Sequence, residues 1–368
     1  MAAAPLVSVL LPVYNAGPYL AAALGSILRQ DYDRLELIAI DDGSTDDSLQ
    51  ILQTYRQADS RVFIISRENR GLIATLNEGL TIAQGELVAP MDADDVAYPW
   101  RLSRQVAPFS QRPDLALCGA GVDFLLGNRI VKGLPDPMLQ KNLLRILSMF
   151  FTVFTHPPIV YNRKVIQDDD LYYDENYNHA EDFDLFRRLA DRYPAAMTPE
   201  NLIAYRIHGD SVTNRHKREM RRTHLKIVAE NLEREDLTQE TQDLRDIGDA
   251  ISMDTVRRAA EWLLALEGRI SGLPAETRPS YEAGALNLFY FLYQLIGDEM
   301  QPQLTHEFLM RTAKWGLIRR RERYVLRTGA YALWFSLISM SATRQVDALS
   351  WYLQSVPAAA ILASYRSS

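Results

Sequence analysis

Apolar runs and amphipathic segments alternate over residues 7–91. The apolar runs have the length of strands, and the segments between them carry apolar residues at helical spacing. Strands are expected at 7–13, 35–40, 62–65 and 86–91, with helices at 19–30, 48–58 and 71–83. Strands that alternate with helices through short connections predict a parallel sheet covered by helices on both faces. The expected fold class is therefore α/β, a Rossmann-like αβα sandwich.

The pattern changes after Arg101. The following elements are expected to be a helix at 101–110, strands at 115–118 and 122–126, an apolar helix at 138–154 and a helix starting near Glu181. From about residue 217 the apolar spacing is helical, with helices expected at 218–235, 254–270, 283–296, 306–318, 324–340 and 348–365. We therefore expect a domain of residues 1–216 and an all-α region of residues 217–368. The role of that region stays open between oligomer, acceptor and membrane-surface contact.

Composition and charge narrow the function classes. The 368 residues carry a net charge of −7, which argues against nucleic acid as the main partner. Cys118 is the only cysteine, so no internal disulfide forms and a reducing compartment is expected. No basic segment precedes the short apolar run at 6–13, so neither a signal peptide nor a membrane span is expected there. These features predict a cytoplasmic protein.

The C-terminal tail has the opposite charge. Residues 301–368 contain nine Lys or Arg against three Asp or Glu. Basic residues at 319–323 beside an aromatic helical segment fit peripheral binding to the cytoplasmic face of a membrane. An ordinary helical subdomain that packs its own aromatic residues is the simpler interpretation, and we favour it for the fold. The apolar stretch at 331–340 is too short to span a bilayer.

Polar clusters follow three of the expected strands, at residues 12–15, 41–47 and 92–95. The carboxyl ends of parallel strands share one edge of the sheet, where ligands bind. Asp92 and Asp94 would point the same way along an extended chain. Two carboxylates on the same side of a strand end repel each other unless a cation lies between them, and their oxygens suit Mg²⁺ or Mn²⁺, which usually also hold a substrate phosphate. An acidic turn in which Asp95 caps a helix is the alternative.

The second cluster and the segment after the third strand fit a nucleotide. Asp41 and Asp42 precede Gly43, and a carboxylate there would accept the N3–H of uracil or bind ribose hydroxyls. Asp46 and Asp47 are better explained as helix caps. Tyr14 would lie along a base, although a half-buried loop aromatic explains it nearly as well.

A helix is expected to begin at Gly71, with Arg67 and Arg70 beside it. A helix N-terminus with nearby guanidinium groups suits a diphosphate. Solvated arginines on a loop are an equally good explanation of this segment.

Glu181 and Asp182 are expected in the first turn of their helix. They either stabilise the helix dipole, or one of them takes a proton from an incoming hydroxyl as a general base. A carboxylate at a helix start is expected to keep a low pKa and to be ionised at neutral pH. His208 would complete a metal site with Asp94, although a lone histidine is more often a surface or core residue.

These clusters resemble glycosyltransferase family 2, which has the GT-A fold. The matching segments are 8–15, 41–46, 92–95, 180–184 and 205–208, in the family's order. The resemblance covers about residues 5–215. It implies an inverting transferase that moves a sugar from a nucleotide-diphospho-sugar, usually UDP-linked, to a hydroxyl of a glycan or lipid-linked acceptor. It also implies a divalent cation, Mn²⁺ or Mg²⁺, and a role in polysaccharide, lipopolysaccharide or other envelope glycan synthesis.

The resemblance also implies residue roles. Asp182 matches the catalytic base with Glu181 beside it, Asp94 and His208 match the metal site, and His156 falls near the acceptor. The residues expected to bind the nucleotide-sugar are Pro12, Val13, Tyr14, Asn15, Asp41, Asp42, Arg70, Asn77, Met91, Asp92 and Ala93. One departure concerns the phosphate contacts: this chain has Thr75-Leu76-Asn77 where many members carry Ala-Arg-Asn. Arg70 is expected to substitute for the missing arginine.

Two other functions share some of these sequence features. A nucleotidyltransferase acting on a sugar phosphate shares the sheet and a metal-binding aspartate. It would normally show a Gly-rich basic phosphate loop near the first strand, and residues 12–17 lack that character. A non-catalytic scaffold that binds sugar nucleotides has no need of Asp92, Asp94, Asp182 and His208 together.

Overall fold

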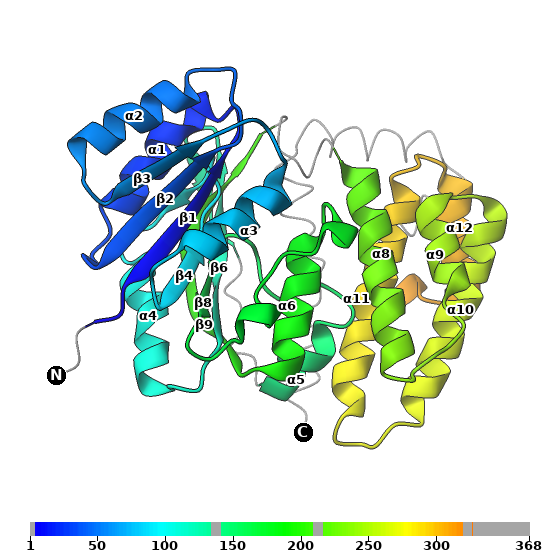
Figure 1. Ribbon diagram of the computed structural model, residues 1–368. Coiled ribbons are helices and arrows are strands. Elements are labelled where there is room, and N and C mark those ends of the chain that lie inside the picture. The colour runs from blue at the N-terminus through cyan, green and yellow to red at the C-terminus, as the bar shows by residue number, and fades with distance from the viewer. Residues whose placement is uncertain (1–3, 134–140, 209–215, 319–325, 327–368) are drawn as a thin grey trace. The chain divides into compact units, whose positions relative to one another are not determined.

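The computed structural model describes residues 4–133, 141–208, 216–318 and 326 of the chain. The chain forms two compact units. The first comprises Met1–Ser148 and Thr152–Arg215, and the second comprises Met149–Phe151 and His216–Ser368. Within their described residues the first unit is α/β and the second is helical (Figure 1).

The first unit is built on one mixed sheet with the strand order β3-β2-β1-β4-β8-β6-β9-β5, and β7 pairs with β6. The strands are β1 (Val7–Val13), β2 (Leu35–Asp41), β3 (Val62–Ser66), β4 (Leu87–Pro90), β5 (Val96–Ala97), β6 (Leu117–Leu126), β7 (Arg129–Val131), β8 (Ile159–Asn162) and β9 (Ala195–Ile207). Strands β1 to β4 are parallel, as predicted. β8 runs antiparallel to both β4 and β6, so the run of neighbouring parallel strands is interrupted after β4, and parallel pairing recurs between β6 and β9.

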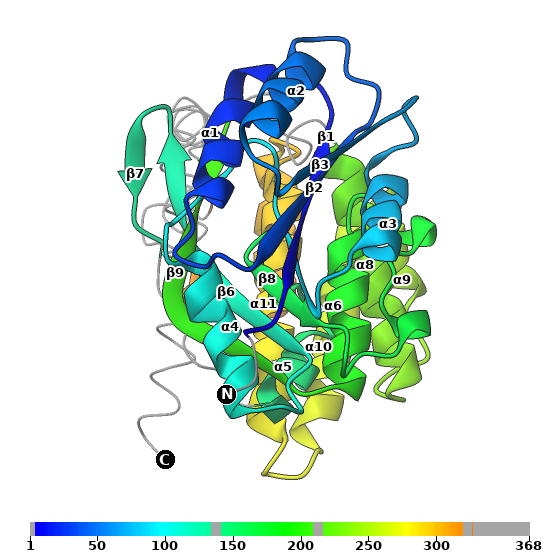
Figure 2. The same cartoon turned by 60° about the vertical axis from the view of Figure 1, so that its left-hand side comes forward.

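Helices cover both faces of this sheet (Figures 1 and 2). Helices α1 (Gly17–Leu28), α2 (Ser48–Ala58) and α4 (Arg101–Gln111) cover one face, and α3 (Leu72–Ile82), α5 (Lys141–Leu147) and α6 (Glu181–Arg192) cover the other. Side chains alternate along a strand, so Val9 of β1 packs with the first group and Leu10 with the second. Complete burial of each such side chain stabilises the fold by about 1.5–3 kcal/mol. The predicted αβα layering is confirmed.

The apolar helix predicted at 138–154 was wrong beyond Leu147. In the described residues, α5 ends at Leu147 and the chain continues without helix through Phe154. Phe150 belongs to the second unit, where its ring lies 6.4 Å from that of Tyr281. Phe154 belongs to the first unit, where its ring lies 5.5 Å from that of Phe186. A continuous helix would place these two side chains on one face, and they could not fill two cores.

The second unit contains α8 (Lys217–Arg234), α9 (Gln242–Asp249), α10 (Met253–Ser271), α11 (Arg278–Gly297) and α12 (Pro302–Thr312). The helices predicted at 218–235, 254–270 and 283–296 are confirmed, whereas the short α9 was not predicted. The helix predicted at 306–318 instead ends at Thr312, followed by a short 3₁₀ turn at Trp315–Leu317. The basic segment 319–323 and the helices predicted at 324–340 and 348–365 lie outside the described residues, apart from Leu326. In the part of the chain that the structure describes, no helix is long and apolar enough to cross a membrane.

Candidate functional site

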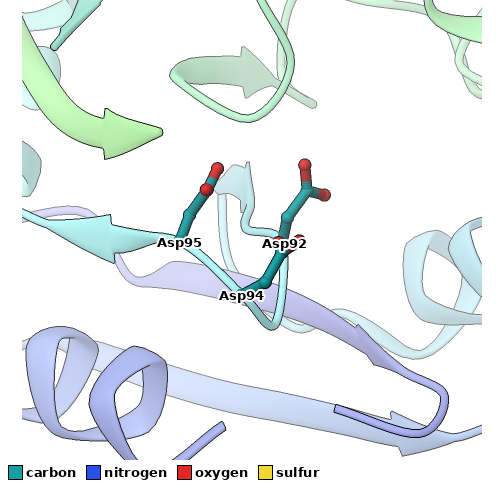
Figure 3. A group of neighbouring side chains, drawn as sticks. All are labelled: Asp92, Asp94 and Asp95. Carbon is teal, nitrogen blue, oxygen red and sulfur yellow. The ribbon is translucent and has the colours of Figure 1, made fainter. Parts of the chain in front are cut away.

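Three carboxylates gather in the turn that follows β4, which we name the acidic turn (Asp92, Asp94 and Asp95). β4 ends at Pro90, and the Asp95 N–H donates to the Asp92 carbonyl at 3.3 Å. Strand alternation was therefore the wrong reason to expect Asp92 and Asp94 together. Carboxylate oxygens of all three residues nevertheless lie within 4.8 Å of one another, and Figure 3 shows Asp92 and Asp95 on the same side of the turn. This oxygen-only cluster suits a hard divalent cation.

The end of β9 is tied to the acidic turn. The Arg206 N–H donates to Asp95 Oδ1 at 2.6 Å, and Arg206 Nε donates to the Asp94 carbonyl at 2.6 Å. Two residues further on, His208 Nε2 lies 2.8 Å from Asp94 Oδ2. The structure thus brings Asp94 and His208 together, as the proposed metal pair requires. The alternative in which Asp95 caps a helix was wrong, because its carboxylate holds the β9 backbone.

Charge in the acidic turn is incompletely compensated. Asp95 Oδ2 is buried and has no hydrogen-bond partner among the described residues. Burial, and after it the charge of Asp92, raises the pKa of both Asp94 and Asp95. A divalent cation would lower these pKa values, and the unpartnered Asp95 oxygen could bind it as a ligand. Asp94, Asp95, Asp92 and His208 therefore fit a cation such as Mn²⁺ or Mg²⁺.

Tyr19 of α1 is a neighbour of this site that sequence reasoning missed. Its ring centroid lies 4.8 Å from that of His208, and the Arg206 guanidinium lies 4.8 Å from the same centroid. The Tyr19 ring therefore limits the orientations that the side chains of His208 and Arg206 can adopt. Only its place directly after the first turn, next to the polar residues 12–15, could have indicated this.

Glu181 and Asp182 occupy the first turn of α6, as predicted. Asp182 Oδ1 accepts a hydrogen bond from the Phe183 N–H at 2.7 Å, and Glu181 Oε2 has no hydrogen-bond partner among the described residues. Burial raises the pKa of both carboxyls, that of Glu181 to about 7. The predicted low pKa was wrong, because desolvation outweighs the stabilisation of charge by the helix N-terminus.

His156 lies between the acidic turn and α6. Its Nδ1 is 3.4 Å from Asp92 Oδ1, and its Nε2 is 3.3 Å from the Tyr173 hydroxyl. The charge of His156 also lowers the pKa of Asp182, against the effect of burial. Asp92, His156 and Asp182 therefore belong to one site, although they come from three separate stretches of the chain.

The side-chain amide of Asn77 is hydrogen-bonded to the backbone of Tyr173. Its amide accepts the Tyr173 N–H and donates to the Tyr173 carbonyl, both at 2.8 Å. This reciprocal pair fixes the loop before α6, and Tyr173 in turn contacts His156. Both the oxygen and the nitrogen of the Asn77 amide therefore have hydrogen-bond partners within the protein, without a nucleotide.

Two buried aspartates, Asp41 and Asp42, lie at the carboxyl end of β2. Asp41 Oδ1 accepts the Ser44 N–H at 3.1 Å, and Oδ2 accepts the Ser66 hydroxyl at 2.8 Å. Asp42 accepts the N–H groups of Arg70 and Gly71 at 2.8 and 2.9 Å. Both carboxylates therefore shape the loops that surround them.

Of the two arginines beside the helix start that would suit a diphosphate, Arg67 is paired with carboxylates. It forms ion pairs with Asp42 and, at 2.6 Å, with Glu78. The Arg70 residue is exposed at the start of α3, where a diphosphate would approach. Of the two arginines, Arg70 is therefore the one positioned to meet a phosphate.

The loop after β1 is pinned and presents an aromatic ring. Pro12 and Val13 end the strand, and Asn15 has a positive φ of 50°. Asn15 Oδ1 accepts the N–H of Thr45 at 2.8 Å, which holds the loop against the one after β2. Tyr14 is left 55% exposed, as a base platform requires.

Two other predicted donor contacts, Met91 and Ala93, have buried side chains. Their side chains fill the core beside the acidic turn. Any contact that they make with a donor therefore uses the backbone.

Comparison with known proteins agrees with this geometry. The family model described as Glycosyl transferase family 2 matches residues 8–170. The O-antigen biosynthesis glycosyltransferase WbnJ of Escherichia coli is 32% identical over 213 residues, which make up 56% of this chain and 81% of that protein.

Two solved structures share the fold at low sequence identity. Mannosyltransferase PcManGT from Pyrobaculum calidifontis, in complex with GDP-Man and Mn²⁺, superposes with a TM-score of 0.55 at 16% identity, covering 96% of this chain and 86% of that one. S. aureus TarS 1–349 in complex with UDP-GlcNAc gives 0.52 at 19% identity, covering 88% and 92%. The site, the family model and the relative lead to one conclusion: the chain belongs to glycosyltransferase family 2 and is a glycosyltransferase with the GT-A fold.

Proposed function

We propose that the protein is an inverting glycosyltransferase that uses a nucleotide-diphospho-sugar, with UDP as the nucleotide. The observation that carries the proposal is the convergence of the acidic turn, His208, His156 and the Glu181–Asp182 pair at one end of the sheet. UDP is chosen because the sequence motifs resemble a largely UDP-dependent family and because TarS binds UDP-GlcNAc in the same fold. The GDP-Man complex of PcManGT makes GDP the competing nucleotide.

The donor is proposed to bind over the carboxyl ends of β1, β2 and β4. Tyr14 would lie along the base, Asp41 would meet the base or ribose, and Asp92 would bind ribose or sugar hydroxyls. Asp94 and His208 would hold Mn²⁺ or Mg²⁺, and the orphaned Asp95 oxygen is a further ligand. When bound there, a divalent cation offsets the negative charge of the departing nucleoside diphosphate.

Asp182 is proposed as the general base. It takes the proton of the acceptor hydroxyl while that oxygen forms a bond to the anomeric carbon. The bond from this carbon to the diphosphate oxygen breaks, and the electron pair leaves with the nucleoside diphosphate. Attack comes from the face opposite the leaving group, so the anomeric configuration inverts. The raised pKa of Asp182 makes its ionised form a stronger proton acceptor.

The acceptor is proposed to be a growing glycan or a lipid-linked sugar of an envelope polysaccharide, approaching near His156. WbnJ, whose name assigns it to O-antigen biosynthesis, supports this class. Peripheral membrane contact through residues 319–365 would suit a lipid-linked acceptor, and those residues lie outside the described ranges apart from Leu326. Cosedimentation with anionic liposomes at low salt tests this contact, and protein that stays in the supernatant contradicts it.

A nucleotide-release assay tests the proposed reaction. The protein is freed of metal with EDTA and mixed with each of a set of UDP- and GDP-sugars, with or without Mn²⁺ or Mg²⁺. We expect release of UDP from one donor only when a cation is added. Release of pyrophosphate from a nucleoside triphosphate would instead indicate a nucleotidyltransferase. Tight donor binding without any release would indicate a scaffold.

A further inference from the structure

Arg101 has a buried guanidinium in the first turn of α4. The residue is 1% exposed, although arginine normally keeps its charge in water. A buried charge costs free energy unless hydrogen bonds or an opposite charge compensate it. Among the described residues no carboxylate lies within ion-pair distance of it, so its hydrogen bonds must account for its burial.

Those hydrogen bonds join two segments that are distant in the sequence. Arg101 Nη2 donates to the Pro90 carbonyl at 2.8 Å and to the Pro157 carbonyl at 3.0 Å. Nη1 lies 3.2 Å from Met91 Sδ, and Nε donates to Gln105 Oε1 at 3.1 Å. One guanidinium therefore links the end of β4 to the loop before β8.

Each linked carbonyl stands next to a residue of the site. Pro90 precedes Asp92 by two positions, and Pro157 directly follows His156. The side chains of Asp92 and His156 meet at 3.4 Å. Arg101 thus fixes the two backbones whose side chains form this contact.

The charge of Arg101 also acts on the acidic turn. Burial lowers the pKa of the guanidinium to about 10, and the charges of Asp92 and Asp95 oppose that effect. The side chain therefore remains protonated at neutral pH. It supplies a fixed positive charge near carboxylates that repel one another, without occupying their oxygens.

Gln105 holds this arrangement in place. Its Oε1 accepts a hydrogen bond from Arg101 Nε. Its Nε2 donates to the carbonyls of Cys118 and Pro158 at 3.0 and 3.1 Å. The fork of a guanidinium can satisfy several acceptors at fixed angles, whereas a lysine ammonium cannot reproduce that geometry.

We propose that Arg101 is a positioning residue: it joins the strand end that carries Asp92 to the loop that carries His156, and it keeps a positive charge beside the acidic turn. This inference rests on the proposed function, in which Asp92 contacts the donor and His156 lies near the acceptor. Arg101 itself touches neither substrate.

The first test is NMR of ¹⁵N-histidine-labelled protein without metal or donor, so it does not depend on catalysis. The His156 ring signals are assigned by their loss in His156→Gln. We expect them to shift or broaden in Arg101→Lys and in Arg101→Met. Arg61→Met is the matched control, because Arg61 also donates to a backbone carbonyl, that of Leu28 at 2.9 Å, but precedes β3, an edge strand that is not adjacent to β4 or β8. His156 signals at their wild-type positions in folded Arg101→Lys would overturn the proposal.

The second test is a double-mutant cycle on the transfer reaction. Arg101→Lys should lower kcat by about ten- to a hundredfold with KM for the acceptor little changed, because misplaced groups slow the chemical step. In a His156→Gln background the same substitution should lower kcat by less than about threefold, since the two residues act through one contact. Equal losses in both backgrounds would contradict the linkage. If no donor is turned over at all, the proposed function fails while the NMR result still decides the role of Arg101.

Discussion

Glu181 and Asp182 stand side by side in the buried first turn of α6, and burial opposes charge on both. The pKa of Glu181 rises from its ordinary value of 4.5 to about 7, first through burial and then through the charge of Asp182. Between these two values the folded protein holds a proton that the unfolded chain has released. The contribution of Glu181 to the free energy of unfolding therefore decreases as the pH rises through this window.

Glu181→Gln removes that penalty. We expect the variant to be more stable than wild type by up to about 3 kcal/mol at pH 8, and by less than about 1 kcal/mol at pH 5, where folded wild type keeps the Glu181 proton. Urea denaturation at the two pH values measures the difference. Glu175→Gln, on an exposed residue of the preceding loop, is the control and should change little at either pH. An equal gain for Glu181→Gln at pH 5 and pH 8 would contradict the assigned pKa.

Asp94 is the residue on which cation binding should depend most. Its carboxylate is shared between the acidic turn and His208. Asp94→Asn should weaken Mn²⁺ binding by at least about tenfold, as the loss of a charged ligand commonly does. Electron paramagnetic resonance of free Mn²⁺ in the presence of UDP measures the affinity. Asp47→Asn serves as an exposed control, and equal affinities in wild type and Asp94→Asn would remove Asp94 from the metal site.

At the scale of helices and loops, one carboxylate fixes two helix starts. Asp46 Oδ2 accepts the Gly17 N–H at the start of α1 at 2.9 Å, and Oδ1 accepts the Ser48 N–H at the start of α2 at 3.0 Å. Asp47 stands at the N-cap position of α2 but makes no capping bond with its side chain. The predicted capping role is thus confirmed for Asp46, while Asp47 lacks the hydrogen bond.

Asp46→Ala should lower the free energy of unfolding by about 1–2 kcal/mol, because the first turns of two helices lose an acceptor. Asp47→Ala is the matched control and should stay within about 0.5 kcal/mol of wild type. Urea denaturation of both variants measures the difference. Equal effects of the two substitutions would show that charge near the helix N-termini matters and that the hydrogen bonds do not.

Elements with strong local patterns were predictable from the sequence. The bounds of β1 and α2 agree with prediction because their apolar periodicity is uninterrupted and turn residues flank both. β8 and β9 were not predicted as strands of this sheet. Their partners lie far away in the chain, and β9 mixes apolar and exposed positions.

The candidate site was predictable where it depends on strand ends. The acidic turn and Asp41 follow from that rule and from the family resemblance, whereas the first turn of α6 follows from helical apolar spacing and the same resemblance. Tyr19, Tyr173 and Arg101 were missed because their roles depend on contacts with backbone groups or with rings far away in the sequence. Such contacts leave no periodic pattern and no local motif. The pKa of Asp182 was mispredicted because the depth of its burial is set by the whole fold.

For the whole molecule, ligand binding should stabilise the first unit, which contains the proposed site. UDP at about a hundred times the dissociation constant that it has in the presence of Mn²⁺ would add roughly 2.7 kcal/mol to the free energy of unfolding. We expect the unfolding transition of that unit to shift upward by several degrees in calorimetry. UDP with EDTA should give a much smaller shift, and Asp94→Asn should respond weakly to both ligands. A shift of the same size with and without the cation would contradict metal-assisted donor binding.

The most direct measurement compares sugar transfer with donor binding in Asp182→Asn. Transfer should fall by at least about a hundredfold, since a positioned general base commonly contributes that much. The dissociation constant for UDP in the presence of Mn²⁺ should stay within about twofold of wild type, because Asp182 acts on the acceptor. Asp191→Asn, on an exposed position of the same helix, should keep full transfer. Transfer by Asp182→Asn within about threefold of wild type would show that another group takes the proton.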